Sequence, residues 1–227
     1  MAKQLIERTV QNVALEYMVS HYKWRAKRGR IWNKIEVRTK KGKRADGLLA
    51  FRKRIIGGTF VASMEAKSFK TLHNIKPRLD NILWVKNSAY YGSIATFLFA
   101  VLIVFKNIDE PRYALMLVLN SWIILTVLVA IFTRKMHINQ TMDVFKQVLL
   151  YKADEQWIAI SKDSFEMIDQ RLQKPFIQVL KARGIGLLIV NSRKKVDRVH
   201  KPKRNRKPFG NFLKYYSVGE EISKYLK

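Results

Sequence analysis

Two carboxylates and one ammonium group lie within two short apolar runs of the N-terminal third of the chain. Asp46 belongs to the run at residues 44–51, and Glu65 and Lys67 belong to the run at residues 60–68. A Gly-Gly pair follows two isoleucines between the runs, which predicts two strands joined by a hairpin. Side chains alternate between the faces of a strand, so Glu65 and Lys67 share a face. The hairpin then brings Asp46 within a few residues of Glu65.

This combination suits the hydrolysis of a phosphodiester with the help of a metal ion. Mg²⁺ and Mn²⁺ prefer hard oxygen ligands, which the carboxylates of Asp46 and Glu65 and the carbonyl of Ala66 supply. Lys67 can orient or deprotonate the attacking water and offset the charge on the phosphate. The alternative is that these groups are ordinary charges on a solvated strand face. Acidic residues are depleted from strands, so two of them within apolar runs favour the catalytic interpretation.

An Asp, a hairpin and then Glu-x-Lys at the end of the next strand resembles the PD-(D/E)xK nucleases, the restriction-endonuclease-like superfamily. The resemblance implies an α/β fold with a mixed central sheet flanked by helices, a Mg²⁺ or Mn²⁺ cofactor and DNA as the substrate. In this family the first helix often brings a carboxylate to the metal site. Residues 4–22 have helical periodicity, and Glu16 is the expected auxiliary residue there, with Glu7 as a weaker candidate. A surface role for Glu16 on an amphipathic helix is the alternative.

The remaining elements follow an order that matches the common core of the resembled nucleases. The order is helix, three strands, a helix that two long apolar runs interrupt, strand, helix and strand. The expected helices are at residues 4–22, 72–86, 136–152 and 164–183, the last kinked by Pro175, and the strands at residues 31–37, 44–51, 60–68, 154–161 and 185–191. Residues 193–207 are expected to be irregular, and residues 209–227 to hold a short packing helix.

Two long apolar runs interrupt this pattern, at residues 88–105 and 114–132, and neither contains a charge. Helices of this length cross most or all of a hydrocarbon core of roughly 30 Å. A pair of buried core helices is the alternative, which a chain this small and polar does not favour. We therefore expect a transmembrane hairpin at residues 81–135, between nuclease segments at residues 1–80 and 136–227. Basic flanks place both termini in the cytoplasm, at the inner (plasma) membrane.

The charge of the chain points to a polyanionic partner. Its 227 residues hold 44 Lys and Arg against 17 Asp and Glu, a formal net charge of +27. The partner is nucleic acid, anionic lipid or both, because both carry the same sign of charge. Basic runs beside the proposed metal site favour binding to a phosphate backbone. The candidate nucleic-acid-binding residues are Arg44, Arg52, Lys53, Arg54, Arg193, Lys194 and Lys195.

Several classes of site find no support in the sequence. The chain has no Cys, so it has neither disulfides nor a thiolate metal site. Its four His are scattered without zinc-ligand spacing, and it has no Walker-type or dinucleotide-binding loop. The start of the chain shows no cleavable signal peptide, and the apolar runs hold no ionisable residue that would indicate a transport pathway.

The sequence thus predicts a membrane-anchored, Mg²⁺-dependent nuclease that hydrolyses DNA on the cytoplasmic side, a location that would suit defence against foreign DNA. One alternative is a non-catalytic tether that holds DNA at the membrane with a degenerate nuclease fold. The other is a membrane protein that binds anionic lipid. Because uncontrolled cleavage harms a cell, we also expect a control device, either a homo-oligomer or a regulatory partner protein.

Overall fold

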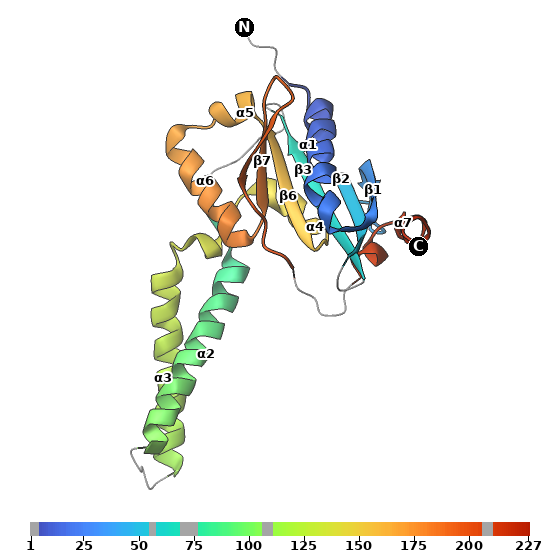
Figure 1. Cartoon of the computed structure of the whole chain (residues 1–227). Helices are drawn as coiled ribbons and strands as arrows, with labels where there is room; N and C mark the ends of the chain where they lie inside the picture. Colours follow the sequence, from blue (N-terminus) through green and yellow to red (C-terminus); the bar gives the residue numbers. More distant parts are fainter. Residues whose placement is uncertain (1–4, 55–57, 69–76, 106–110, 206–210) are drawn as a thin grey trace. The chain divides into compact units, whose positions relative to one another are not determined.

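The computed structural model describes residues 5–54, 58–68, 77–105, 111–205 and 211–227 (Figure 1). The chain divides into two compact units. Residues 1–76 and 142–227 form the first unit, and residues 77–141 form the second. The first unit is an α/β unit with a mixed central sheet flanked by helices, which is the coarse class that the sequence predicts.

Six strands form the central sheet, in the order β1-β2-β3-β6-β7-β8. The first three strands are antiparallel, β6 and β7 run parallel to β3, and β8 returns antiparallel to β7. Every residue of β6 is buried, as expected for a strand covered on both faces. The strand bounds are β1 (Ala26–Arg38), β2 (Arg44–Lys53), β3 (Thr59–Lys67), β6 (Glu155–Ser161), β7 (Gly186–Val190) and β8 (Val196–His200).

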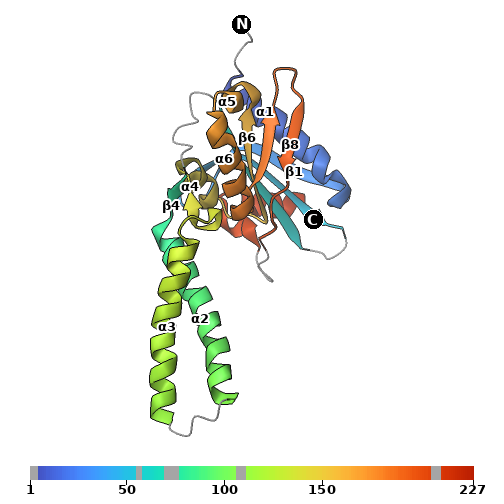
Figure 2. The same cartoon turned by 90° about the vertical axis from the view of Figure 1, so that its left-hand side faces the viewer.

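Helices cover both faces of this sheet (Figure 2). On one face, α1 (Glu7–Tyr22) packs against β3, β6 and β7. On the other face, α4 (Asp143–Leu150) and α6 (Gln170–Arg183) pack against β6 and β7. The short helix α5 (Lys162–Glu166) lies between β6 and α6 in the chain, and η1 (Lys23–Arg25) follows α1 directly. The sheet is therefore the middle layer of three, and side chains on its two faces enter different environments.

The C-terminal segment closes the remaining part of the sheet. A 3-10 turn, η4 (Phe212–Tyr215), and the helix α7 (Gly219–Tyr225) pack on β1 and β2. Tyr216 is fully buried in this cluster, and its hydroxyl donates to the carbonyl of Lys152 at 3.1 Å. The packing helix that the sequence predicts in this segment is thus present.

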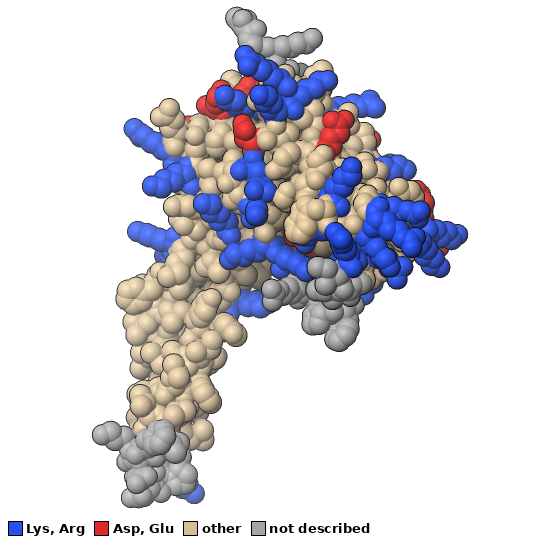
Figure 3. Space-filling model, viewed as in Figure 1, with Lys and Arg blue, Asp and Glu red and all other residues tan. Residues whose placement is uncertain are grey.

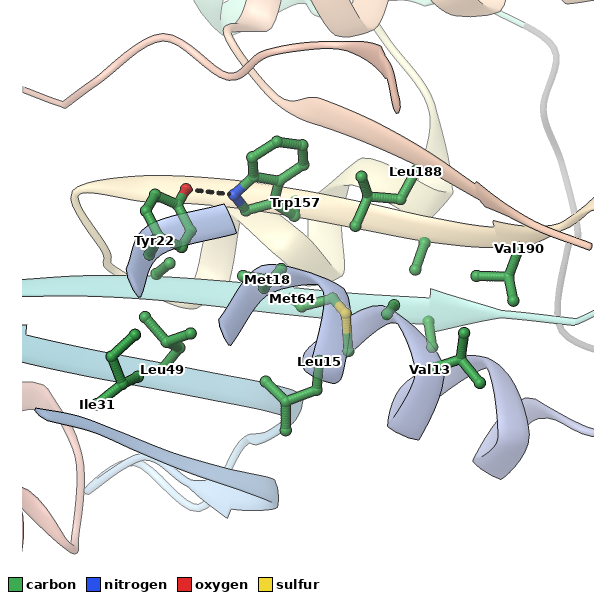
Figure 4. Close-up of a cluster of buried hydrophobic side chains, with 14 of the residues drawn as sticks. Val13, Leu15, Met18, Tyr22, Ile31, Leu49, Met64, Trp157, Leu188 and Val190 are labelled. Carbon is green, nitrogen blue, oxygen red and sulfur yellow. Dashed lines mark hydrogen bonds between the residues drawn. The ribbon is translucent and has the colours of Figure 1, made fainter. Parts of the chain in front are cut away.

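The end of α1 is fixed to the start of β6 by a buried polar network. Figure 4 shows Tyr22 beside Trp157, whose indole Nε1 donates to the Tyr22 hydroxyl at 2.8 Å. The Tyr22 hydroxyl in turn donates to the carboxylate of Glu155. Arg25 forms an ion pair with the other carboxylate oxygen at 3.2 Å. Each buried polar group therefore has a partner, which removes the cost of placing it among apolar side chains.

The second unit is a helical hairpin of α2 (Asn81–Phe105) and α3 (Pro111–Thr133). Gly92 lets the two helices approach closely, because a Cβ at this position would lie 2.8 Å from the Cα of Thr126. The indole of Trp84 donates to the carbonyl of Ala130 at 2.9 Å. At the base, the short strands β4 (Arg78–Leu79) and β5 (Gln140–Thr141) pair, next to η3 (His137–Asn139).

Among the described residues, one helix is long and apolar enough to span a membrane, judged by length and composition, and it covers Arg112–Thr133. The predicted second span at residues 88–105 lies in α2 and stays a prediction.

Several sequence-based element boundaries are wrong. The helix expected at residues 72–86 begins only at Asn81; its first part lies outside the described residues, and Arg78–Leu79 form a strand. Asp80 accounts for this start, because its carboxylate accepts from the backbone N–H of Leu83 at 3.1 Å. The helix expected at residues 136–152 is shortened to α4.

Two further differences lie in the C-terminal half. The helix expected at residues 164–183 is two helices, and the break precedes Asp169 instead of occurring at Pro175. Asp169 caps α6 through its carboxylate, which accepts from the N–H of Arg171 at 2.9 Å. The segment expected to be irregular contains β8, which is an edge strand and mostly exposed, so its apolar pattern is weak.

The polar network at Tyr22 predicts a loss of stability when its central hydroxyl is removed. Tyr22→Phe leaves the Trp157 N–H without its acceptor and Glu155 without one donor. We expect the melting temperature of the detergent-solubilised chain to fall by about 2–10 °C, which corresponds to roughly 1–3 kcal/mol. Tyr17→Phe, on the same helix, is the matched control. An equal melting temperature for both variants would show that the network does not stabilise the fold.

Candidate active site

Asp46, Glu65 and Lys67, the three candidates from the sequence, lie close together where β2 begins and β3 ends. In the β2–β3 pair, Gly47 is opposite Met64, and continuing this register by one residue places Asp46 opposite Glu65. The Asp46 carboxylate accepts from the backbone N–H of Ala66 at 2.8 Å. The Lys67 ammonium donates to the Glu65 carboxylate at 2.7 Å. The hairpin and the alternation of faces therefore assemble the predicted cluster.

These charged groups are deeply buried. Asp46 is 5% exposed, Glu65 is 0% exposed and Lys67 is 7% exposed. Met64 and Ala66, which alternate with them along β3, enter the apolar core under α1. A charge removed from water in this way is costly unless it is paired or coordinates a metal, so the cluster is not an ordinary solvated strand face.

The burial changes the acidity of both carboxyl groups. The pKa of Glu65 is raised to about 7, chiefly by burial and then by the negative charge of Asp46, against which the Lys67 ammonium acts only in part. The pKa of Asp46 is also raised by burial, with the N–H of Ala66 and the charge of Lys67 acting in the opposite direction. Two carboxylates in one buried site thus hold more negative charge than one lysine neutralises.

The cluster has an acceptor to spare. Lys67 contacts Oε1 of Glu65, while Oε2 of Glu65 is buried and has no hydrogen-bond partner among the described residues. The N–H and carbonyl of one strand residue point to the same side, so the carbonyl of Ala66 faces β2, where Asp46 lies. Two carboxylates and a carbonyl thus supply hard oxygen atoms on two neighbouring strands.

This oxygen set fits a small divalent cation. Mg²⁺ is commonly held by one or two carboxylates and completes its octahedron with water and substrate oxygens. Within the described part of the chain, no three His, Cys, Asp or Glu side chains lie close enough to form a metal site by themselves. The fit therefore depends on the backbone carbonyl of Ala66 and on water, in addition to Asp46 and Glu65.

Glu16, the preferred auxiliary carboxylate, is not part of this cluster. It is exposed and lines a different cleft, between α1 and β1, together with Asn33 and Lys34. Glu7 lines the cleft of the cluster instead, and its charge raises the pKa of both Asp46 and Glu65. At 100° per residue, nine residues of helix place Glu16 about 180° away from Glu7. Because of this rotation about the axis of α1, the weaker sequence candidate, Glu7, lines the cleft of the cluster and Glu16 does not.

Two residues of the site carry no signal in the sequence. The side-chain carbonyl of Gln147, on α4, accepts from the Lys67 ammonium at 3.1 Å. Tyr151, four residues later, donates its hydroxyl to the carbonyl of Arg44, and burial together with the charge of Glu65 raises its pKa to about 12. A Gln and a Tyr four residues apart match no catalytic motif, so only the structure places them at the site.

The cluster opens into a cleft of about 590 Å³ whose rim is cationic. Lys43 and Arg44 come from the turn before β2 and from its first residue, and Lys146 comes from α4. Together with Lys67 they surround the carboxylates on more than one side. Positive charge around a carboxylate pair suits an anionic substrate that also contacts a bound cation.

The other predicted nucleic-acid-binding residues divide between the two ends of the sheet. Arg193, Lys194 and Lys195 lie at the turn between β7 and β8 and are exposed. This turn follows the carboxyl end of β7. Because β3 and β7 run in the same direction, Glu65 and Lys67 at the carboxyl end of β3 lie at the same end of the sheet. The group of Arg52, Lys53 and Arg54 lies at the opposite end of β2, so the structure does not bring it to the carboxylates.

Comparison of the chain with protein-family models, curated proteins and solved structures finds no match. The assignment of a function therefore rests on the residues and on their geometry. The resemblance to the PD-(D/E)xK nucleases likewise remains a resemblance in the sequence of Asp46, Glu65 and Lys67 and in the order of the surrounding elements.

Proposed function

We propose that the protein is a metal-dependent nuclease of the PD-(D/E)xK type that hydrolyses phosphodiester bonds in DNA. The observation that carries this proposal is the buried cluster of Asp46, Glu65 and Lys67 at the mouth of a cationic cleft. Its spare carboxylate oxygen supports a bound cation. The choice of DNA rests on the family resemblance.

Each residue of the cluster has a distinct part in the proposed reaction. Asp46, Glu65 and the carbonyl of Ala66 would hold Mg²⁺ or Mn²⁺, which would supply Lewis-acid chemistry at the phosphate and at a bound water. Lys67, held between Glu65 and Gln147, orients the attacking water and offsets the charge that develops on the phosphoryl oxygens. The water oxygen bonds to phosphorus and loses a proton to solvent, while the bond from phosphorus to one sugar oxygen breaks and that oxygen takes up a proton from solvent.

We further propose that the hairpin of α2 and α3 anchors the protein in the inner (plasma) membrane, with the α/β unit and both termini in the cytoplasm. Along both helices, many large apolar side chains are exposed, which water does not favour. Lys86, Arg134 and Lys135 flank the hairpin on the side of its base, as the positive-inside rule expects for a cytoplasmic flank. At such a site a nuclease would meet incoming foreign DNA, and an oligomeric state or a partner protein would control it.

Substitution of the cluster tests the catalytic proposal. Asp46→Asn, Glu65→Gln and Lys67→Met should each lower Mg²⁺-dependent cleavage of DNA by at least about 100-fold, because each removes a cation ligand or the group that stabilises the transition state. Glu7→Gln should lower it by roughly tenfold, as expected for a residue that acts on the ligands through its charge. The measurement is the loss of linear and circular DNA with the detergent-purified chain, with and without EDTA.

Glu16→Gln is the matched control for these variants, since it changes a carboxylate on the same helix but in another cleft. It should cleave DNA at the rate of the unchanged chain. Cleavage that survives all three cluster substitutions would contradict the assignment of the site. DNA binding without cleavage under every metal would favour the non-catalytic tether instead.

The raised pKa of Glu65 predicts how cleavage depends on pH. The pKa is about 7, so below this pH the carboxyl group holds a proton that a cation must displace, and above it the carboxylate is free to bind. The Mg²⁺ concentration that gives half-maximal cleavage should therefore rise by about tenfold for each pH unit below about 7. A half-maximal concentration that is the same at about pH 6 and about pH 8 would show that Glu65 is not a ligand.

The membrane proposal predicts where the chain fractionates in cells. After an alkaline carbonate wash, which removes peripheral proteins, the full chain should stay with the membrane pellet, because two apolar helices cross the bilayer. Release into the supernatant would contradict the anchor. A protease added from outside to intact inner-membrane spheroplasts should leave the α/β unit uncut, as expected for a cytoplasmic location.

A further inference from the structure

A basic track follows the edge strand of the sheet. Between residues 27 and 44 the chain has nine Lys and Arg and a single acidic residue, Glu36. All nine are exposed. Figure 3 shows blue side chains crowded on the right-hand side of the molecule, where Figure 1 has β1 and α7. The members of the track are Lys27, Arg28, Arg30, Lys34, Arg38, Lys40, Lys41, Lys43 and Arg44.

The track is continuous with the candidate active site. Its last two residues, Lys43 and Arg44, line the cleft that holds Asp46 and Glu65. Its first residues lie at the other end of β1, where Ala26 pairs with Lys53. A strand of 13 residues spans roughly 40 Å, so the track leads from the carboxylates to a point far from them.

At the far end of the track stands an exposed tryptophan. Trp24 lies in η1, and its side chain is 72% exposed. Its neighbours hold the turn in place: Tyr22 is fully buried, and Arg25 is paired with Glu155 and lies over the ring of Phe60 at 4.7 Å. The backbone N–H of Arg54 also donates to the carbonyl of Arg25 at 3.1 Å. The indole is therefore presented to solvent from a fixed backbone.

Protection of a sheet edge explains part of this arrangement but not all of it. Charged residues and bulges on an edge strand prevent it from pairing with other chains, and β1 has both. A large exposed indole has the opposite effect, because it adds an apolar surface beside the edge. Protection also gives no reason for the charge to continue into the catalytic cleft.

We propose that Trp24 and the basic track bind a single-stranded segment of the nucleic acid substrate and lead it to the cleft. Phosphates follow the track, and the indole stacks on an unpaired base, the combination that single-strand-binding proteins use. Bases inside a duplex already stack on each other, so Trp24 selects for unpaired ones. This inference rests on the proposed function and adds to it the class of substrate.

The surface fits a nucleic acid strand better than a lipid bilayer. Binding to a membrane interface needs a group of apolar side chains beside the basic ones. On η1 and β1, among the described residues, Trp24 is the one large apolar side chain that is highly exposed. The charge is also drawn out along one strand, which matches the shape of a polynucleotide.

The test measures binding and not cleavage. The full chain with Glu65→Gln, in detergent micelles, is titrated into a fluorescent single-stranded DNA of about 20 nucleotides, longer than the roughly 4–16 nucleotides that such sites cover. Trp24→Ala should weaken this binding by at least about fivefold, the lower bound for loss of one base–aromatic stack, and should change binding to a blunt duplex by less than about twofold. Trp24→Phe should recover most of the affinity.

Met167→Ala, which removes another highly exposed apolar side chain of the same unit, is the matched control and should have no effect. A second variant, Lys34→Gln, should reduce the salt dependence of single-strand binding by about 0.7 in log–log slope, as expected for one phosphate contact. No change with Trp24→Ala, or an equal loss for single strands and duplexes, would overturn the proposal.

The membrane alternative is tested with the same protein. Because the chain has no Cys, Trp24→Cys can carry a single environment-sensitive dye. The dye should respond to single-stranded DNA and not to phosphatidylserine in the surrounding nanodisc. A response to the lipid alone would assign Trp24 to the membrane surface and overturn the proposal. If the chain binds single strands selectively but never cleaves DNA, the binding proposal stands and the proposed nuclease function is contradicted.

Discussion

The burial of the Glu65 carboxylate beside Asp46 is the constraint on which the rest of the structure depends. A fully buried carboxylate is costly unless its charge is balanced, and a single lysine and one backbone N–H do not balance two carboxylates. Burial, and after it the negative charge of Asp46, raises the pKa of Glu65. A cation at the unpartnered oxygen of Glu65 would balance the remaining negative charge, so the burial of the two carboxylates favours the binding of a metal ion.

The surrounding elements hold this unfavourable arrangement in place. The β2–β3 register fixes Asp46 against Glu65, while α4 brings Gln147 to the Lys67 ammonium. The parallel strand β6, fully buried, supports β3 on its other side. Lys67 is the last residue of β3, and Gln147 lies in α4, the first helix of the α/β unit after the helical hairpin in the chain.

The parts of this site that depend on local periodicity could be predicted from the sequence. The period of two along β3 correctly places Glu65 and Lys67 on one face, and the apolar runs give the order of the buried strands. The choice between Glu7 and Glu16 depends on the rotation of α1 about its axis, which an amphipathic pattern fixes too loosely to decide. Gln147 on α4 and Tyr151 directly after it are brought in by tertiary packing, for which a Gln and a Tyr four residues apart give no signal in the sequence. The edge strand β8 was not predicted because most of its residues are exposed, so it lacks the apolar run of a buried strand.

Direct binding of Mn²⁺ to the purified chain tests the central claim, that the buried cluster holds a divalent cation. Electron paramagnetic resonance at about pH 8 reports free Mn²⁺, so a titration counts the bound ions. We expect a site that is present in the unchanged chain and in Glu16→Gln, is lost in Glu65→Gln, and weakens as the pH falls below about 7. Equal Mn²⁺ binding by the Glu65→Gln variant and the unchanged chain would contradict the central claim.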